Sequence, residues 1–338
     1  MVVVAAAACS PTPHWYAFAG SQSPSITVAG AGKVHSWPAT AADHGGVISI
    51  AWGRDGTSLY VTVGETTSVL REYRRDDGEL IVQIPLKSDE HAAQAFDRTA
   101  RSLYLADGGD VVSLHIAPLG IAARIPACAN WLTALTFFDH AARLFAVCRD
   151  GTVTEIDTKL ARVIRSVPIS SETRCEPTAT MLSANGTVLF VACRRGRVLY
   201  LDRVTLRTLY SVDVDAEIGD MVLDATGRFA VIIPGAGLEI VVLDVRRRVV
   251  TARIGMTQLP LDAAVAADGT VAILTGDGVT SGMLVVLDPS TGQTRNSTSP
   301  PPGSRLVAVW PDDSPVMRWL PHRESAPPLQ PPESGGSE

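Results

Sequence analysis

The sequence predicts an all-β chain folded as a seven-bladed β-propeller, and three observations carry this prediction. A turn residue of the Asp or Asn type recurs about every 43 residues, which is the period of a propeller blade. Each period holds four short apolar runs rich in Val, Ile and Tyr, as strands are. The chain lacks the 3.6-residue periodicity of a helical solenoid, and a parallel β-helix would need a much shorter repeat.

The recurring turn separates the first strand of each blade from the second. An apolar run follows it, for example Leu59-Tyr60-Val61. Asp-Gly or Asn-Gly pairs at three of these turns supply the positive φ angles that tight hairpins require. The turn residues are Asp55, Asp97, Asp139, Asn185, Asp224, Asp268 and Asp312.

The third and fourth strands of the blades have their own signatures. Four predicted third strands end in an aspartate, namely Asp157, Asp202, Asp244 and Asp288. Three predicted fourth strands close with Ile-Pro or Val-Pro. Proline cannot donate a ladder hydrogen bond, so it suits the end of an outer strand.

Six full blades occupy about residues 47–298, and an incomplete piece remains at each end. Residues 304–320 offer an inner strand, and residues 15–37 offer three further strands. We expect these two pieces to combine into a last blade closed by strands from both chain ends, which leaves no free sheet edge. Eight blades are the alternative, if each end forms its own.

The segments Leu59-Tyr60-Val61-Thr62-Val63 and Met283 to Gly292 resemble the repeat of the YVTN family of β-propellers. In that repeat a Tyr-Val strand precedes an apolar strand that ends in Asp, followed by a Thr-Gly turn. The resemblance covers roughly residues 47–298. It implies the fold, but the family includes envelope proteins and lactonase-like enzymes, so it implies no single function.

Both chain ends differ from the repeat region. Residues 1–9, MVVVAAAAC, resemble the end of a bacterial lipoprotein signal, with Cys9 as the lipidated residue. A basic region is missing, so a buried N-terminal strand is the alternative. We expect a signal-like segment at 1–9, a tether at 10–25, a single β-propeller domain at 26–320 and a disordered Pro/Ser-rich tail at 321–338.

Composition and charge limit the partners. Of the 338 residues 46% are hydrophobic, which is enough for one large core. The net charge of -6 gives no concentrated basic face for nucleic acid. No apolar run reaches the roughly 18 residues that cross a bilayer, so we expect the chain to contact a membrane only through an N-terminal lipid. We also expect a monomer.

The remaining four cysteines repeat with the blades. Cys128 and Cys175 precede the inner strands of two neighbouring blades, and Cys148 and Cys193 end the second strands of the same blades. Hairpin geometry brings such positions together, so we predict the disulfides Cys128–Cys148 and Cys175–Cys193. Buried free thiols or a shared metal site are the alternatives. Disulfides would place the protein outside the cytosol.

The sequence contains no motif that defines a catalytic, cofactor or metal site. Gly30-Ala31-Gly32-Lys33 resembles the end of a phosphate loop, but Thr27 and Val34 replace its first Gly and its Ser/Thr. The nucleophile-elbow, H-E-x-x-H and C-x-x-C-H patterns are absent. We therefore predict no catalytic residue, no cofactor and no metal ligand.

Propellers usually bind ligands where the loops before inner strands and the turns after second strands meet. Polar side chains expected on that face could hold a polar ligand, or they could be ordinary solvated loops. They are His44, Glu65, His91, Asp107, Asp110, Arg149, Asp150, Arg194, Arg195, Asp220, Asp262 and Asp277.

These features favour a non-enzymatic cell-envelope lipoprotein whose propeller is a binding or assembly platform for a protein or small polar ligand. A lactonase-like hydrolase is the first alternative, and it would need His, Glu and Arg side chains that converge over the central channel. A periplasmic sensor or a subunit of a redox complex is the second.

Overall fold

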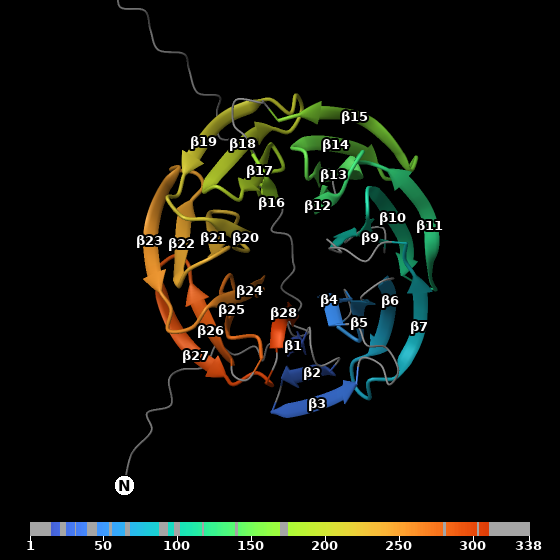
Figure 1. Ribbon diagram of the computed structural model, residues 1–338, viewed down its shortest axis with the longest axis vertical. Coiled ribbons are helices and arrows are strands. Elements are labelled where there is room, and N and C mark those ends of the chain that lie inside the picture. The colour runs from blue at the N-terminus through green and yellow to red at the C-terminus, as the bar shows by residue number, and fades with distance from the viewer. Residues whose placement is uncertain are drawn as a thin grey trace, which may run out of the picture.

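The computed structural model describes residues 15–20, 25–30, 32–38, 46–53, 56–64, 68–87, 94–97, 102–116, 118–138, 141–169, 175–279, 282–302 and 304–310. These residues form seven four-stranded antiparallel sheets, arranged as blades of a ring (Figure 1). The predicted seven-bladed β-propeller is confirmed, and the eight-bladed alternative is wrong. No helix in these ranges is long and apolar enough to span a membrane.

Each blade is built outward from an inner strand at the centre of the ring. The inner strands are β4 (Gly46–Trp52), β8 (Gln94–Asp97), β12 (Leu132–Phe138), β16 (Pro177–Leu182), β20 (Ile218–Leu223), β24 (Pro260–Val265) and β28 (Ser304–Trp310). The second strands are β5 (Ser58–Gly64), β9 (Ser102–Asp107), β13 (Arg143–Cys148), β17 (Val188–Cys193), β21 (Phe229–Pro234), β25 (Val271–Gly276) and β1 (Trp15–Gly20).

The third and fourth strands complete the blades. The third strands are β6 (Ser68–Arg74), β10 (Asp110–Ile116), β14 (Thr152–Asp157), β18 (Arg197–Asp202), β22 (Glu239–Asp244), β26 (Gly282–Asp288) and β2 (Ser25–Gly30). The outer strands are β7 (Leu80–Pro85), β11 (Leu119–Pro126), β15 (Arg162–Pro168), β19 (Thr208–Asp213), β23 (Val249–Gly255), β27 (Gln293–Thr298) and β3 (Lys33–Pro38). We number the blades 1 to 6 from β4–β7 to β24–β27, and blade 7 is β28 with β1–β3.

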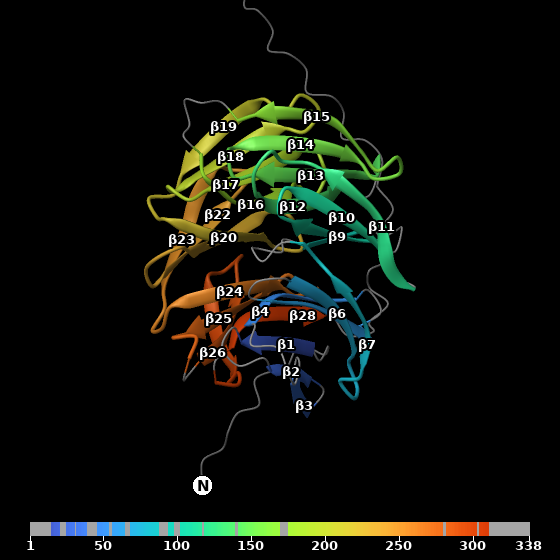
Figure 2. The ribbon, with the colours of Figure 1, turned by 45° about the vertical axis from the view of Figure 1, so that its right-hand side comes forward.

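Blade 7 closes the ring with strands from both ends of the chain. Strand β1 pairs with β2 on one side and with β28 on the other, where Phe18 lies opposite Val307 (Figure 2). The predicted closure is therefore confirmed. The boundary predicted for the tether is corrected, because β1 begins at Trp15, within the segment 10–25. The reason is burial: Phe18 is 2% exposed and belongs to the core between blades 6 and 7.

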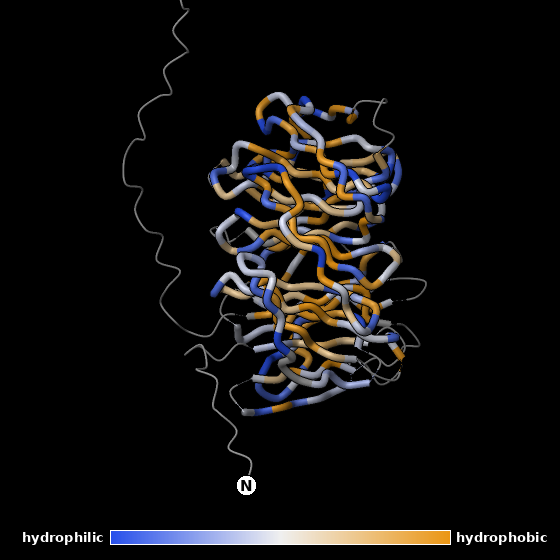
Figure 3. Tube along the Cα trace, turned by 90° about the vertical axis from the view of Figure 1, so that its left-hand side faces the viewer, coloured by the Kyte–Doolittle hydropathy of each residue, from blue (hydrophilic) through white to orange (hydrophobic). Residues whose placement is uncertain are grey.

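The core consists of apolar layers between neighbouring blades. All six residues of β9, β21 and β25 are buried, whereas β15 and β23 alternate between exposed and half-buried positions. One layer joins blades 4 and 5 and includes Phe190, Tyr200 and Ile232. Figure 3 shows the propeller turned by 90°, with hydrophobic colour in the strands and hydrophilic colour in many of the loops at its edges. Each fully buried Leu, Ile or Phe in these layers contributes about 1.5 to 3 kcal/mol.

The aspartates that end four third strands close the turn to the outer strand. In blade 5 the Asp244 carboxylate accepts hydrogen bonds from the backbone N–H groups of Arg246 and Arg247, at 3.0 and 2.9 Å. Asp157 and Asp288 accept equivalent bonds in blades 3 and 6. Burial raises the pKa of Asp157 and Asp244, but these hydrogen bonds and a neighbouring arginine together lower it below its usual value. The hydrogen bonds from Ser290 lower the pKa of Asp288 against the opposing effect of burial. The recurring aspartates are therefore turn-forming residues.

Candidate functional site

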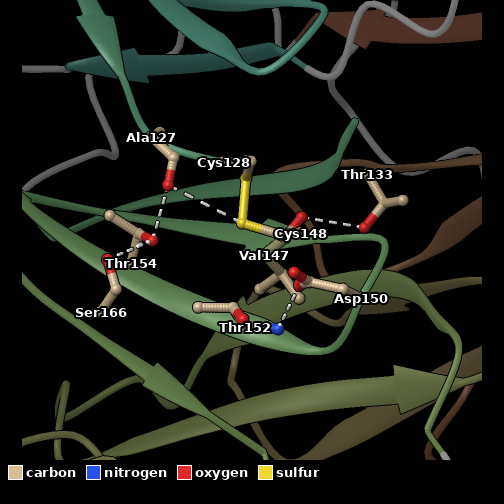
Figure 4. The surroundings of a disulfide bond; sticks show 9 residues. All are labelled: Ala127, Cys128, Thr133, Val147, Cys148, Asp150, Thr152, Thr154 and Ser166. Atoms are coloured by element: carbon tan, nitrogen blue, oxygen red, sulfur yellow. Dashed lines mark hydrogen bonds between the residues drawn. A yellow bond between two sulfur atoms is a disulfide. The ribbon is translucent and has the colours of Figure 1, made fainter. Parts of the chain in front are cut away.

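Both predicted disulfides are present. Cys128 and Cys148 are joined at an S–S distance of 2.05 Å, with Cα atoms 5.6 Å apart (Figure 4). Cys175 and Cys193 are joined at 2.01 Å, with Cα atoms 5.0 Å apart. Each bond ties the loop before an inner strand to the end of the next strand of the same blade. We call the side of the ring that carries these bonds the disulfide face.

Each disulfide holds a short turn that begins with an arginine. Cys148 is followed by Arg149-Asp150-Gly151, and Cys193 by Arg194-Arg195-Gly196. The N–H of each glycine donates to the carbonyl of its cysteine, at 2.9 and 3.0 Å. Both glycines have positive φ, and a Cβ at Gly196 would lie 2.7 Å from the Ala216 carbonyl oxygen. Glycine is therefore required at this turn.

The disulfides thus present arginines on two neighbouring blades. Arg149 and Arg195 are exposed, and neither guanidinium forms an ion pair within the described residues. Arg194 instead pairs with Glu176 at 3.1 Å and with Glu217 of blade 5 at 3.5 Å. All three of these side chains are more than 40% exposed, so the pairs contribute little to stability.

Exposed apolar side chains lie on the same face. Trp131, in the loop that carries Cys128, is 38% exposed, and its carbonyl accepts the N–H of Arg149 at 2.9 Å. Leu238, Leu259 and Val279 are 49%, 40% and 51% exposed on the loops of blades 5 and 6. Aromatic side chains and arginines are enriched at protein-binding surfaces.

Other residues predicted for this face have structural partners. The Asp107 carboxylate is fully buried, accepts the N–H of Lys87 at 2.9 and 3.0 Å and pairs with Arg124. The Lys87 ammonium lies 3.9 Å from Asp110. Asp107 therefore joins blades 1 and 2. Asp277 accepts the N–H of Val279 within its own turn, at 2.8 Å.

Four residues predicted as sites cannot be placed on the structure. His44, Glu65, His91 and Cys9 lie outside the described residues. A role of the other predicted residues as ligand contacts stays a prediction. Within the described ranges no three His, Cys, Asp or Glu side chains gather as a metal site would need.

Two aspartates of neighbouring inner strands form a carboxyl pair. Asp220 of β20 and Asp262 of β24 occupy equivalent positions, because each follows a bulge near the start of its strand. The Asp262 carboxylate accepts the N–H of Val307 in β28, at 2.7 Å. Burial and, to a smaller extent, the charge of Asp220 together raise the pKa of Asp262 to about 8, although the hydrogen bond from Val307 lowers it. Burial also raises the pKa of Asp220 to about 6.

At neutral pH this pair therefore retains a proton on Asp262. A protonated carboxyl removes one negative charge from this part of the inner-strand ring. The sequence predicts both residues on the ligand face. It does not indicate their raised pKa values, because burial by a neighbouring blade has no local sequence signal.

No family model matches the sequence, and no curated protein matches it either. Solved structures do match. A chain of "Crystal Structure of Mitotic Checkpoint Complex" aligns with a TM-score of 0.64 and 13% identity, over 75% of this chain and 79% of that one. The Cps50 (Swd1) β-propeller domain of Myceliophteria thermophila aligns with a TM-score of 0.63 and 14% identity, over 78% and 89%.

A chain of Kuenenia stuttgartiensis hydrazine synthase aligns with a TM-score of 0.60 and 15% identity, over 75% of this chain and 80% of that one. The shared feature is the propeller. At these identities the similarity shows the fold alone, and the resemblance to the YVTN repeat has no family match to support it.

Proposed function

We propose that this chain is a non-enzymatic, extracytoplasmic binding platform that takes a protein partner on its disulfide face. The observation that carries the proposal is the pair of disulfide-held turns, which present Arg149 and Arg195, with the exposed Trp131 next to Arg149. Ordered loops lose less conformational entropy on binding than mobile ones, so crosslinked turns favour a binding role. Exposed aromatic and arginine side chains are the residues that dominate binding energy at protein interfaces.

The disulfides also support the location. Such bonds persist in oxidising compartments and are rare in the cytosol. A lipidated Cys9 would hold the propeller at a membrane surface, and the proposal includes this anchor. Intact mass of the protein from its native envelope tests it, since a diacyl or triacyl mass on Cys9 is expected and an unmodified Cys9 would refute the anchor alone.

Propellers of similar fold support a binding role. One aligned chain comes from a mitotic checkpoint complex, which is by its name an assembly. The residues described here include no catalytic motif on the disulfide face, whereas the face carries both unpaired cations and exposed apolar side chains. We therefore favour an assembly role over a hydrolase.

The experiment is crosslinking of the full chain to its native envelope, followed by quantitative mass spectrometry. Arg149→Glu combined with Arg195→Glu reverses two charges on the disulfide face. We expect capture of the main partner to fall at least about tenfold, because two contacts of hot-spot type would be lost.

The matched control is Arg162→Glu combined with Arg207→Glu. These two exposed arginines lie at turns on the opposite side of the ring, and the charge change is identical. The control should capture the partner as the unmodified protein does. Equal loss in both double variants, or capture that neither pair affects, would refute the disulfide face as the binding surface.

A further inference from the structure

A cavity of about 580 Å³ lies between blades 4 and 5, on the side of the ring opposite the disulfide face. Its walls come from the first turn of each blade, from the outer strand β19 and from the turn after Asp244. Phe190, Val188 and Val245 supply apolar surface. This volume lies within the range of small-molecule sites, which extends from about 300 to 1,000 Å³.

The cavity wall contains a polar group that has no protein partner. Tyr200 is 3% exposed, and its hydroxyl forms no hydrogen bond with the residues that the structure describes. Its ring contacts Phe190 edge to face, with centroids 4.9 Å apart. Burial raises the pKa of Tyr200 to about 12, so the hydroxyl keeps its proton and can donate. A buried hydroxyl without a partner is destabilising, and a ligand acceptor would satisfy it.

The mouth of the cavity carries two arginines, Arg246 and Arg248. Neither guanidinium forms an ion pair with a described residue, whereas Arg247 and Arg228 lie 3.9 and 3.1 Å from the Asp244 carboxylate. The two charges at the mouth are therefore available to an anion.

Arg248 occupies the left-handed position of the turn between the third and the outer strand of blade 5, with a φ of +62°. The same position is left-handed in other blades, where Gly78, Ala161, Leu206 and Gly292 occupy it. In this conformation the Arg248 guanidinium lies 3.5 Å from the centroid of the Tyr210 ring, at the cavity wall.

We propose that this cavity binds a small amphipathic carboxylate, with its apolar part against Phe190 and Val245 and its carboxylate held by Arg246, Arg248 and the Tyr200 hydroxyl. The apolar walls exclude a fully polar anion, which would lose its hydration there without hydrogen-bond partners. The arginines and the unpaired hydroxyl favour a carboxylate over a neutral ligand, because charged hydrogen bonds are stronger than neutral ones.

The experiment uses 4-phenylbutyrate as probe and its neutral amide, 4-phenylbutyramide, as the matched compound. Calorimetry and ligand-detected NMR on the full chain give the two affinities. We expect saturable binding of the acid at least about tenfold tighter than that of the amide, from the charged contacts.

Three variants and one control locate the binding. Tyr200→Phe should lower the affinity for 4-phenylbutyrate by about three- to tenfold, which is the effect of one hydrogen bond. Arg246→Gln and Arg248→Gln should each lower the affinity for the acid and leave the affinity for the amide unchanged. Arg247→Gln is the control, because it removes the same charge from the same turn but does not line the cavity.

Absence of saturable binding of the acid would refute the proposal. Equal affinities for acid and amide would refute it too, as would loss of binding in Arg247→Gln equal to that in Arg246→Gln. Thermal unfolding of every variant verifies folding, and Tyr200→Phe should unfold no earlier than the unmodified protein, because it removes only an unpaired hydroxyl. The site is independent of the protein-binding face, so either proposal can fail alone.

Discussion

Asp262→Asn should stabilise the propeller at pH 8 and change little at acidic pH. The carboxyl bridges blades 6 and 7, since it accepts the N–H of Val307 at 2.7 Å. Asparagine keeps an acceptor oxygen at this position, so the bridge survives the substitution. The variant loses only the ionisable carboxyl. Burial and the charge of Asp220 both disfavour ionisation of that carboxyl.

The size of the effect follows from proton binding. The pKa of Asp262 rises from 3.8 to about 8 on folding, so between pH 5 and pH 8 the folded chain holds a proton that the unfolded chain has released. The free energy of unfolding therefore falls as pH rises, by up to about 1.4 kcal/mol per pH unit. The side chain is half-buried and water screens it in part, so we expect about 2 to 4 kcal/mol over this range.

Urea unfolding at pH 5, 6, 7 and 8 measures this difference between Asp262→Asn and the unmodified chain. Asp288→Asn is the control. Hydrogen bonds lower the pKa of Asp288, so its stabilisation is lost only below about pH 4 and its effect should be constant from pH 5 to pH 8. A difference for Asp262→Asn that does not grow with pH would show that the carboxyl is ionised in the folded chain.

Three further outcomes test the fold. Replacing Cys128 and Cys148 by serine should lower the free energy of unfolding by about 3 kcal/mol, from the loop entropy of a 20-residue separation, measured in urea with and without reductant. Asp107→Ala should cost about 3 to 5 kcal/mol, because it leaves its buried partners unpaired, and a loss below about 1 kcal/mol would contradict a structural role. Gly78→Ala should lower the melting temperature by several degrees, because its φ is +70° and a Cβ would lie 2.4 Å from the Trp37 ring; an unchanged melting temperature would contradict that strain.

The blade pattern was predictable because its signals are local. A hairpin needs a turn residue and two apolar runs, and all three lie within one short segment, as around Leu59 to Val63 in β5. The disulfides were predictable for the same reason, since each joins residues of a single blade. The closing blade required only that two incomplete pieces complete each other.

The cavity and the carboxyl pair were not predictable, because they arise between blades. Tyr200 belongs to an ordinary apolar strand in the sequence, and only the neighbouring turn at Arg248 makes this side chain part of a cavity wall. The sequence predicts Asp262 on the ligand face, yet its raised pKa comes from burial and, to a smaller extent, from the charge of Asp220 on the neighbouring inner strand. Arg194 was expected as a ligand contact, but Glu176 and Glu217 engage it from other loops.

The composition of blade 7 links folding to the order of synthesis. Strands β1 to β3 leave the ribosome first, and their inner neighbour β28 is the last described strand to be made. Until β28 arrives, β1 has an open edge on its inner side. A chain that stops before Ser304 would keep six whole blades and an unsealed ring, with exposed edges for proteases and chaperones to recognise. The ring can therefore close only after synthesis has passed Trp310.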